Sequence, residues 1–85
     1  NRLEQVAYST ISSRLAALLL ELGGEEAGAD VRATHQELAD MLGTWRETIS
    51  KTLQDFRRRG LISSSRRQVT LLDRDGLQLE AGRIL

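Results

Sequence analysis

The sequence contains no cysteine, and this absence excludes two kinds of structure. Without thiols there is no disulfide framework and no thiolate metal site, which agrees with the reducing conditions of a cytoplasm. Histidine is almost as scarce, because His35 is the single one in the chain. It has no cysteine or carboxylate partner at the spacing that metal ligands adopt, so we expect no metal site.

Long apolar runs are also missing. The longest, residues 15–20, is far shorter than the roughly 20 residues that a membrane-spanning helix needs. No signal-peptide pattern opens the chain, so we expect a cytoplasmic protein with no membrane partner. The 85 residues suffice for one small domain with a modest core, and the chain begins without methionine, which indicates a fragment or a processed chain.

The formal net charge is zero, which by itself argues against binding to nucleic acid. The charges are nevertheless unevenly distributed. Residues 44–67 contain seven basic and two acidic side chains, whereas residues 1–43 contain three basic and seven acidic ones. A basic segment in a neutral domain is typical of a face that meets phosphate, but a solvated, arginine-rich helix end would give the same pattern. Charge alone leaves both interpretations open.

The most informative pattern lies in residues 34–62, where two helix starts follow each other closely. Thr34 stands three residues before Glu37, and Thr44 stands three residues before Glu47. This is the spacing of a capping box, in which a hydroxyl and a carboxylate satisfy the free N–H groups of a helix start. Both threonines are therefore expected to begin a helix.

Glycines mark the ends of both helices. Gly43 can adopt the positive φ that a tight helix-to-helix turn needs, and Gly60 is a stop signal. The pattern predicts helices over residues 35–42 and 45–59. Their lengths and the short turn are typical of a helix-turn-helix, whose second helix enters the DNA major groove.

The faces of these helices agree with that prediction. At about 100° per residue, Ile49, Leu53 and Phe56 form an apolar stripe on the second helix. Its opposite side is polar and consists of Glu47, Lys51, Gln54 and Arg58, flanked by Arg46 and Ser50. The apolar side of the first helix consists of Leu38, Met41 and Leu42.

An amphipathic helix is predicted upstream of this pair. Thr10 is a candidate cap, and Gly23-Gly24 would end the helix. The apolar stripe that we expect to face the core consists of Ile11, Leu15, Leu18 and Leu22.

Downstream, residues 61–63 and 68–72 favour two strands joined by a polar turn. A hairpin after a recognition helix is a wing, and Arg66 and Arg67 near its tip would reach a phosphate backbone. Arginines that serve only the solubility of the hairpin are the alternative. Asp73 can cap a last short helix, which Gly76 and Gly82 would weaken.

The string THQELADMLGTWRETISKTLQDFRRRGLI is more specific than any of these patterns alone. The residues that carry its specificity are Thr34, Gln36, Glu37, Leu38, Ala39, Gly43, Arg46, Glu47, Thr48, Ile49, Leu53, Gly60, Leu61 and Ile62. The string resembles the DNA-binding helix-turn-helix of the cyclic-AMP receptor protein and fumarate–nitrate reductase regulator family (Crp/Fnr). The resemblance implies a mainly α fold with a small β-hairpin, a winged helix-turn-helix.

The resemblance also implies a domain organisation. Residues 1–9 would be the end of a dimerisation helix, and residues 10–85 the DNA-binding domain. Within that domain we expect an edge strand over residues 31–33, the helix-turn-helix over 34–60, the wing over 61–72 and a short helix over 74–82.

The family's proteins are larger and act as homodimers on palindromic double-stranded DNA. They carry an effector domain upstream of the segment that this chain matches, so we expect no cofactor in the chain itself. The resemblance implies that the chain is part of a bacterial transcription regulator. RNA polymerase is a further candidate partner.

Base reading is expected from Arg46, Glu47 and Lys51, with Ser50 and Gln54 as lesser candidates. Arginine can donate two hydrogen bonds to guanine and glutamate can accept one from cytosine, each pair worth about 1–3 kcal/mol. The family often has arginine at the position of Lys51, and lysine lacks the bidentate fork. Phosphate contacts are expected from Thr34, His35, Gln36, Thr44, Arg66 and Arg67.

Trp45 departs from the family, in which a small hydroxyl residue is common at this position. We expect its side chain to pack against the first helix of the pair, and stacking on the sugar-phosphate backbone is the alternative.

Two other functional classes compete with DNA binding. A winged-helix module for protein–protein contact would predict an apolar recognition face, whereas this face is polar. An enzyme would need a catalytic constellation, but the chain has no cysteine, one histidine, no glycine-rich phosphate loop after a strand and no carboxylate cluster. We therefore expect a protein that is not an enzyme.

Overall fold

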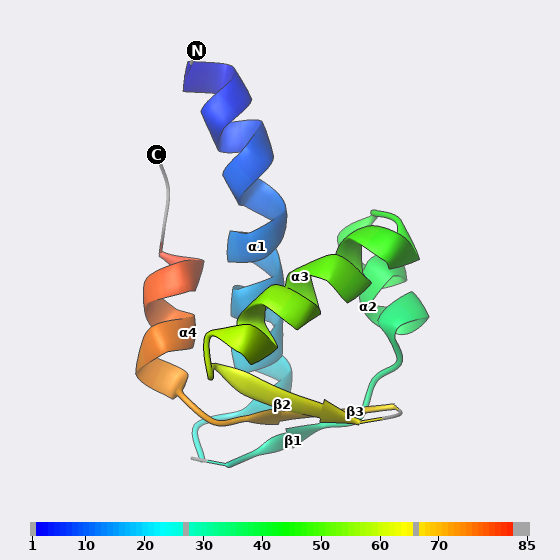
Figure 1. Ribbon diagram of the computed structural model, residues 1–85, viewed down its shortest axis with the longest axis vertical. Helices are drawn as coiled ribbons and strands as arrows, with labels where there is room; N and C mark the ends of the chain where they lie inside the picture. Colours follow the sequence, from blue (N-terminus) through cyan, green and yellow to red (C-terminus); the bar gives the residue numbers. More distant parts are fainter. Residues whose placement is uncertain (1, 27, 66, 83–85) are drawn as a thin grey trace.

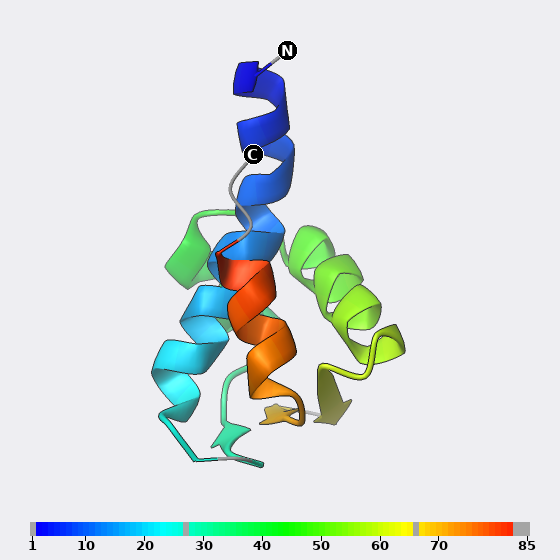
Figure 2. The same ribbon diagram turned by 90° about the vertical axis from the view of Figure 1, so that its left-hand side faces the viewer.

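The computed structural model describes residues 2–26, 28–65 and 67–82, with side chains from residue 11 onward (Figures 1 and 2). Its elements in chain order are α1 (Arg2–Gly23), β1 (Asp30–Val31), α2 (His35–Leu42), α3 (Arg46–Arg58), β2 (Ile62–Ser65), β3 (Gln68–Leu71) and α4 (Arg74–Ala81). The predicted winged helix-turn-helix is thus confirmed. Within the described ranges, no helix is both long enough and apolar enough to cross a bilayer.

The three strands form one antiparallel sheet in the order β1-β3-β2. The predicted edge strand exists, but it covers Asp30–Val31, and Val31 pairs with Val69 of β3. The polar turn was predicted too long, because β2 continues through Ser64 and Ser65. Ser65 pairs with Gln68, so only two residues remain between the strands. Cross-strand hydrogen bonds therefore override the polar, turn-like composition of this segment.

The core lies where α1, α3 and the sheet converge. Phe56 and Leu53 of α3 and Leu15 and Leu19 of α1 belong to one buried apolar cluster. Burying a side chain of this size stabilises a fold by about 1.5–3 kcal/mol. The other buried apolar residues are Ala16, Val31, Ala33, Leu38, Ala39, Leu42, Ile49, Leu61, Ile62, Val69, Leu71 and Leu77.

Helix α1 differs from its prediction. It runs without interruption from Arg2 to Gly23, so Thr10 lies inside a helix and does not cap one. Its buried stripe is Leu15, Ala16 and Leu19, whereas the predicted core residue Leu22 is 44% exposed. Met41 of α2, also predicted to be in the core, is 53% exposed, and Ala39 is buried instead.

Helix α4 lies beside α1 and closes the core from the C-terminal side (Figures 1 and 2). As predicted, Asp73 caps it by accepting a hydrogen bond from the Gly76 backbone N–H at 2.9 Å. Gly76 was expected to weaken the helix, but it has a packing role. A Cβ atom at this position would overlap Cδ2 of Leu61, so glycine permits the close approach of α4 to the strand start.

Candidate nucleic-acid interface

The start of α2 is built as the sequence predicts. The Thr34 hydroxyl accepts from the Glu37 backbone N–H at 3.0 Å, and the Glu37 carboxylate accepts from the Thr34 backbone N–H at 2.9 Å. The backbone hydrogen bond from Thr34 is the main reason that the pKa of Glu37 lies below its usual value, followed by the bond to the threonine side chain. The capping box fixes the helix end that is expected to meet phosphate.

The turn between α2 and α3 corrects the second predicted capping box. Gly43 has a left-handed φ of 69°, as expected, and its N–H donates to the Asp40 carbonyl. The next N–H, that of Thr44, donates to the Ala39 carbonyl at 2.9 Å. Thr44 therefore belongs to the C-terminal cap of α2. The N-cap of α3 falls one residue later, on Trp45.

The buried side and the exposed side of helix α3 are the ones that were predicted. Ile49, Leu53 and Phe56 are buried in the core. Four of the five candidate base-reading residues are exposed on the helix surface, namely Arg46, Glu47, Lys51 and Gln54. They present a guanidinium, a carboxylate, an ammonium and an amide, which together can donate to and accept from base edges.

Ser50, the fifth candidate, makes a hydrogen bond within the fold. Its hydroxyl lies 2.8 Å from Nδ1 of His35, and both side chains are half-buried. This hydrogen bond joins the first residue of α2 to the middle of α3, so it fixes the angle between the two helices. The bond occupies one ring nitrogen of His35 and leaves Nε2 available for a further hydrogen bond. Two residues fifteen positions apart on different helices carry no sequence signal of such pairing.

The wing tip and the amino ends of both helices meet in one shallow hollow. It is lined by Thr34, His35, Gln36, Arg46, Ser65 and Arg67. In Figure 1, α2 begins directly above the turn end of the β2–β3 hairpin. Five of the six lining residues were candidate DNA contacts, so the fold gathers on one surface residues from three separate parts of the chain. Arg66 lies outside the described residues.

A second hollow adjoins this one on the other side of Arg67. Arg32, Ala33, Thr34, Glu37 and Arg67 line it. Arg67 adopts a left-handed φ of 63°, which fits its place in the two-residue hairpin turn. Arg32 is exposed beside it and was not predicted as a site residue. Its position just before the Thr34 cap is a signal that could have identified it.

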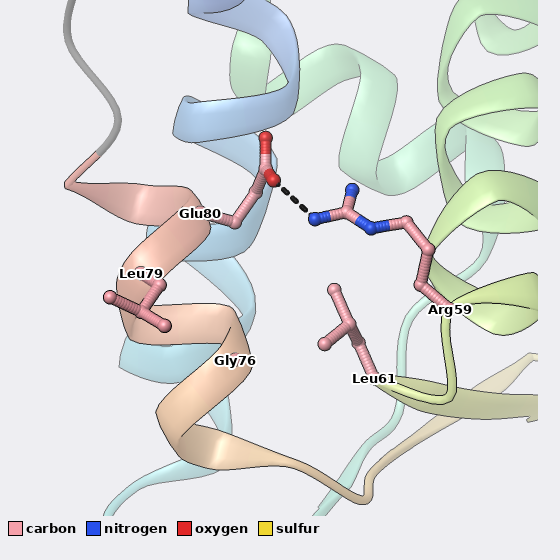
Figure 3. Close-up of a pocket in the computed structure, with 5 residues that line it drawn as sticks. All are labelled: Arg59, Leu61, Gly76, Leu79 and Glu80. Atoms are coloured by element: carbon pink, nitrogen blue, oxygen red, sulfur yellow. Dashed lines mark hydrogen bonds and ion pairs between the residues drawn. The ribbon is translucent and has the colours of Figure 1, made fainter.

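Arg59 belongs to the basic segment of residues 44–67, for which charge alone left two interpretations open, but its side chain bonds within the fold. Its guanidinium donates to Glu80 of α4 at 2.6 Å (Figure 3). It also donates to Asp55 at 3.0 Å. These two carboxylates, Glu80 foremost, raise the pKa of Arg59. Glu80 is buried, so Arg59 supplies the charge that its carboxylate needs and ties α3 to α4. Arg57 and Arg58 are exposed on the last turn of α3.

Trp45 does not pack against α2 as expected. Its side chain is 76% exposed, more than almost any other large apolar residue described. In the part of the chain that the structure describes, no group of three or more His, Asp or Glu side chains could hold a metal ion. The arrangement therefore offers hydrogen bonding, positive charge and one exposed aromatic ring.

Comparisons with known proteins agree with this geometry. The family model of the Crp-like helix-turn-helix domain matches residues 13–80. The chain is 39% identical over 83 residues to the transcriptional regulator SdrP of Thermus thermophilus, covering 91% of this chain and 41% of that protein. It is 33% identical over 88 residues to the CRP-like cAMP-activated global transcriptional regulator of Mycobacterium tuberculosis, covering 95% and 39%.

Solved structures give the same result. A crystal structure of a CRP/FNR-family transcriptional regulator from Thermus thermophilus superposes with a TM-score of 0.83 and 37% identity, covering 99% of this chain and 46% of that one. The catabolite activator protein of Thermus thermophilus superposes with a TM-score of 0.81 and 26% identity, covering 98% and 39%. The chain thus spans less than half the length of these relatives. These are regulators of transcription and not enzymes, and this chain belongs to their family, CRP/FNR, as its Crp-like helix-turn-helix DNA-binding domain.

Proposed function

We propose that this chain binds double-stranded DNA in a sequence-specific manner, with α3 in the major groove. The observation that carries the proposal is the exposed row of Arg46, Glu47, Lys51 and Gln54 on the side of α3 that faces away from the core. Arg46 and Glu47 occupy the first turn of the helix, where recognition helices contact base edges. Arg46 would read guanine and Glu47 would read cytosine.

Phosphate contacts would flank this row. The proposed contacts are Thr34, His35, Gln36, Thr44, Arg66 and Arg67. The free N–H groups at the start of α2 favour an anion, and Arg67 beside them adds a full positive charge. For Ser50 we propose a supporting role through His35 in place of direct base contact, because their hydrogen bond is already made.

For the longer protein we propose a cytoplasmic homodimer on a palindromic operator, which agrees with the activity of its relatives as transcriptional regulators. The first turns of α1 would belong to the dimerisation helix, and an effector domain would precede it. Two copies of α3 would then enter successive major grooves about 34 Å apart.

The test is selection of binding sites from a random duplex pool with the 85-residue chain, followed by fluorescence anisotropy of the selected duplex over a salt series. We expect enrichment of a half-site containing G·C pairs and an affinity that falls linearly on a logarithmic salt scale. Arg46→Ala should then lose preference at one G·C pair. Absence of binding even at low salt would contradict the proposed function and favour a protein-interaction module.

A further inference from the structure

Trp45 is unusual in two respects, its exposure and its position at the start of a helix. It is the only tryptophan of the chain, yet its side chain is 76% exposed. Aromatic side chains of this size normally provide a large share of a core or an interface. Trp45 is also the N-cap of α3, with an extended φ of −84° and ψ of 146° that suits serine, threonine or aspartate. An indole has no oxygen with which to accept from the free N–H groups of the helix start.

Such departures from local consistency are expected at functional positions, because the fold gains nothing from them. Trp45 contributes little burial and no side-chain cap to this chain. Its backbone is nevertheless firmly held, since its carbonyl accepts the first hydrogen bond of α3, from the Ile49 N–H at 3.2 Å. The turn therefore places the exposed indole at the start of α3, next in the chain to Arg46 and Glu47, which are also exposed.

We propose that Trp45 is a DNA-backbone contact, in which the ring lies on a deoxyribose at the rim of the major groove and Nε1–H donates to a phosphate oxygen. This inference rests on the proposed function. The N-cap directly precedes the base-facing turn of α3, so it lies where that helix crosses the edge of the groove. An indole fits this place because it joins an apolar face to a single donor, and phosphate is an acceptor.

A tryptophan contact to the DNA backbone should affect binding differently from an arginine contact. A neutral indole displaces no counterions, so it adds affinity without adding to the salt dependence. It also touches sugar and phosphate, which are the same in every sequence. A phosphate contact by Arg67 at the wing tip would also be independent of sequence, but its charge would add to the salt dependence. Removal of that charge should reduce the salt slope by about 1. Arg67→Ala is therefore the matched control.

The experiment compares the unaltered 85-residue chain with Trp45→Ala, Trp45→Ser and Arg67→Ala on the selected duplex and on a scrambled one. Anisotropy gives the affinity across a salt series, and emission of the single tryptophan reports directly on the contact. For Trp45→Ala we expect a loss of roughly fivefold to tenfold on both duplexes, with an unchanged salt slope. The emission of the unaltered chain should change on saturation with either duplex.

Trp45→Ser is the control for a loss of binding that is caused by a less stable fold. Serine supplies the missing cap, so the variant should melt at a higher temperature and still bind as weakly as Trp45→Ala. Unchanged affinity and unchanged emission, with binding seen by anisotropy, would overturn the backbone contact and leave the proposed function intact. A loss confined to the selected duplex would overturn it in favour of base reading. If the unaltered chain bound no DNA, both proposals would fall, and the exposed indole would be assigned to a protein partner.

Discussion

The two helix starts of the helix-turn-helix carry the same T-x-x-E motif but fold differently. Thr34 and Glu37 form both hydrogen bonds of a capping box. Thr44 and Glu47 have the same spacing, yet α3 begins on Trp45. The difference arises upstream of each motif. Strand β1 ends three residues before Thr34, whereas Gly43 directly precedes Thr44, and the Thr44 N–H donates to the Ala39 carbonyl at the end of α2.

This comparison shows that a capping motif depends on what the preceding residues already require. Here the Thr44 N–H bonds to the end of α2, and the N-cap of α3 is the next residue, Trp45. As a result, the N-cap of α3 is Trp45, whose side chain accepts no hydrogen bond from the helix start and is exposed. Four predictions test this contrast, in order of decreasing effect.

Gly43→Ala should cause the largest loss. A side chain at a left-handed φ of 69° is strained, so we expect a decrease in the free energy of unfolding of about 1–2 kcal/mol. Urea denaturation followed by circular dichroism would measure it. Gly82→Ala is the control, because Gly82 also ends a helix but has a φ of −83°. Equal losses at both glycines would contradict the role given to Gly43.

The two threonines should respond differently to truncation. Thr34→Ala removes the hydroxyl of a formed capping box and should cost about 1 kcal/mol of stability. Thr44→Ala should cost less than about 0.5 kcal/mol of stability. Thr44 caps α2 through its backbone N–H, which alanine retains. Urea midpoints of the two variants, measured side by side, decide the matter. A larger loss for Thr44→Ala would restore the second capping box.

Trp45→Ser should change stability in the opposite direction. Serine can accept from the free N–H groups of α3, and little packing is lost with a side chain that is 76% exposed. We expect a gain of about 0.5–1 kcal/mol. Thermal melting would show it as a higher Tm, and Trp45→Val, which supplies no acceptor, is the control. A lower Tm for the serine variant would mean that the indole stabilises the fold.

The smallest effect is a pH dependence that belongs to one glutamate only. The folded-state pKa of Glu37 lies below its usual value of 4.5, chiefly because of the backbone hydrogen bond at Thr34. Its stabilising contribution is therefore present above pH 4.5 and is lost as the pH falls through the folded-state pKa. Glu37→Gln should lower stability at pH 7 and converge with the unaltered chain in acid. Glu47→Gln, at a glutamate outside a capping box, is the matched control.

Local chemistry was sufficient to predict much of this protein. Gly43 and Gly60 end their helices with positive φ, as their type and spacing indicate. The 3.6-residue period separated the buried stripe of α3 from its exposed row, so Arg46, Glu47, Lys51 and Gln54 were assigned to the correct side. Their expected contact with bases stays a prediction.

Contacts between distant residues could not be predicted in this way. His35 and Ser50 each looked like a free polar side chain, and only the crossing of α2 over α3 brings them within 2.8 Å. Arg59 looked like part of a basic surface until α4 brought the buried Glu80 to it. Such pairs depend on the relative positions of whole helices, which core packing determines and local spacing does not encode.

The sequence by itself determined where α2, α3 and α4 lie and where α2 and α3 end, because caps, glycines and periodicity act over three or four residues. The tertiary structure decided which polar side chains are engaged within the fold and which remain exposed. Ser50 and Arg59 make side-chain hydrogen bonds to distant residues, whereas Trp45 is exposed. The reason is physical: whether a polar or aromatic group is buried and bonded depends on neighbours that only the assembled core supplies.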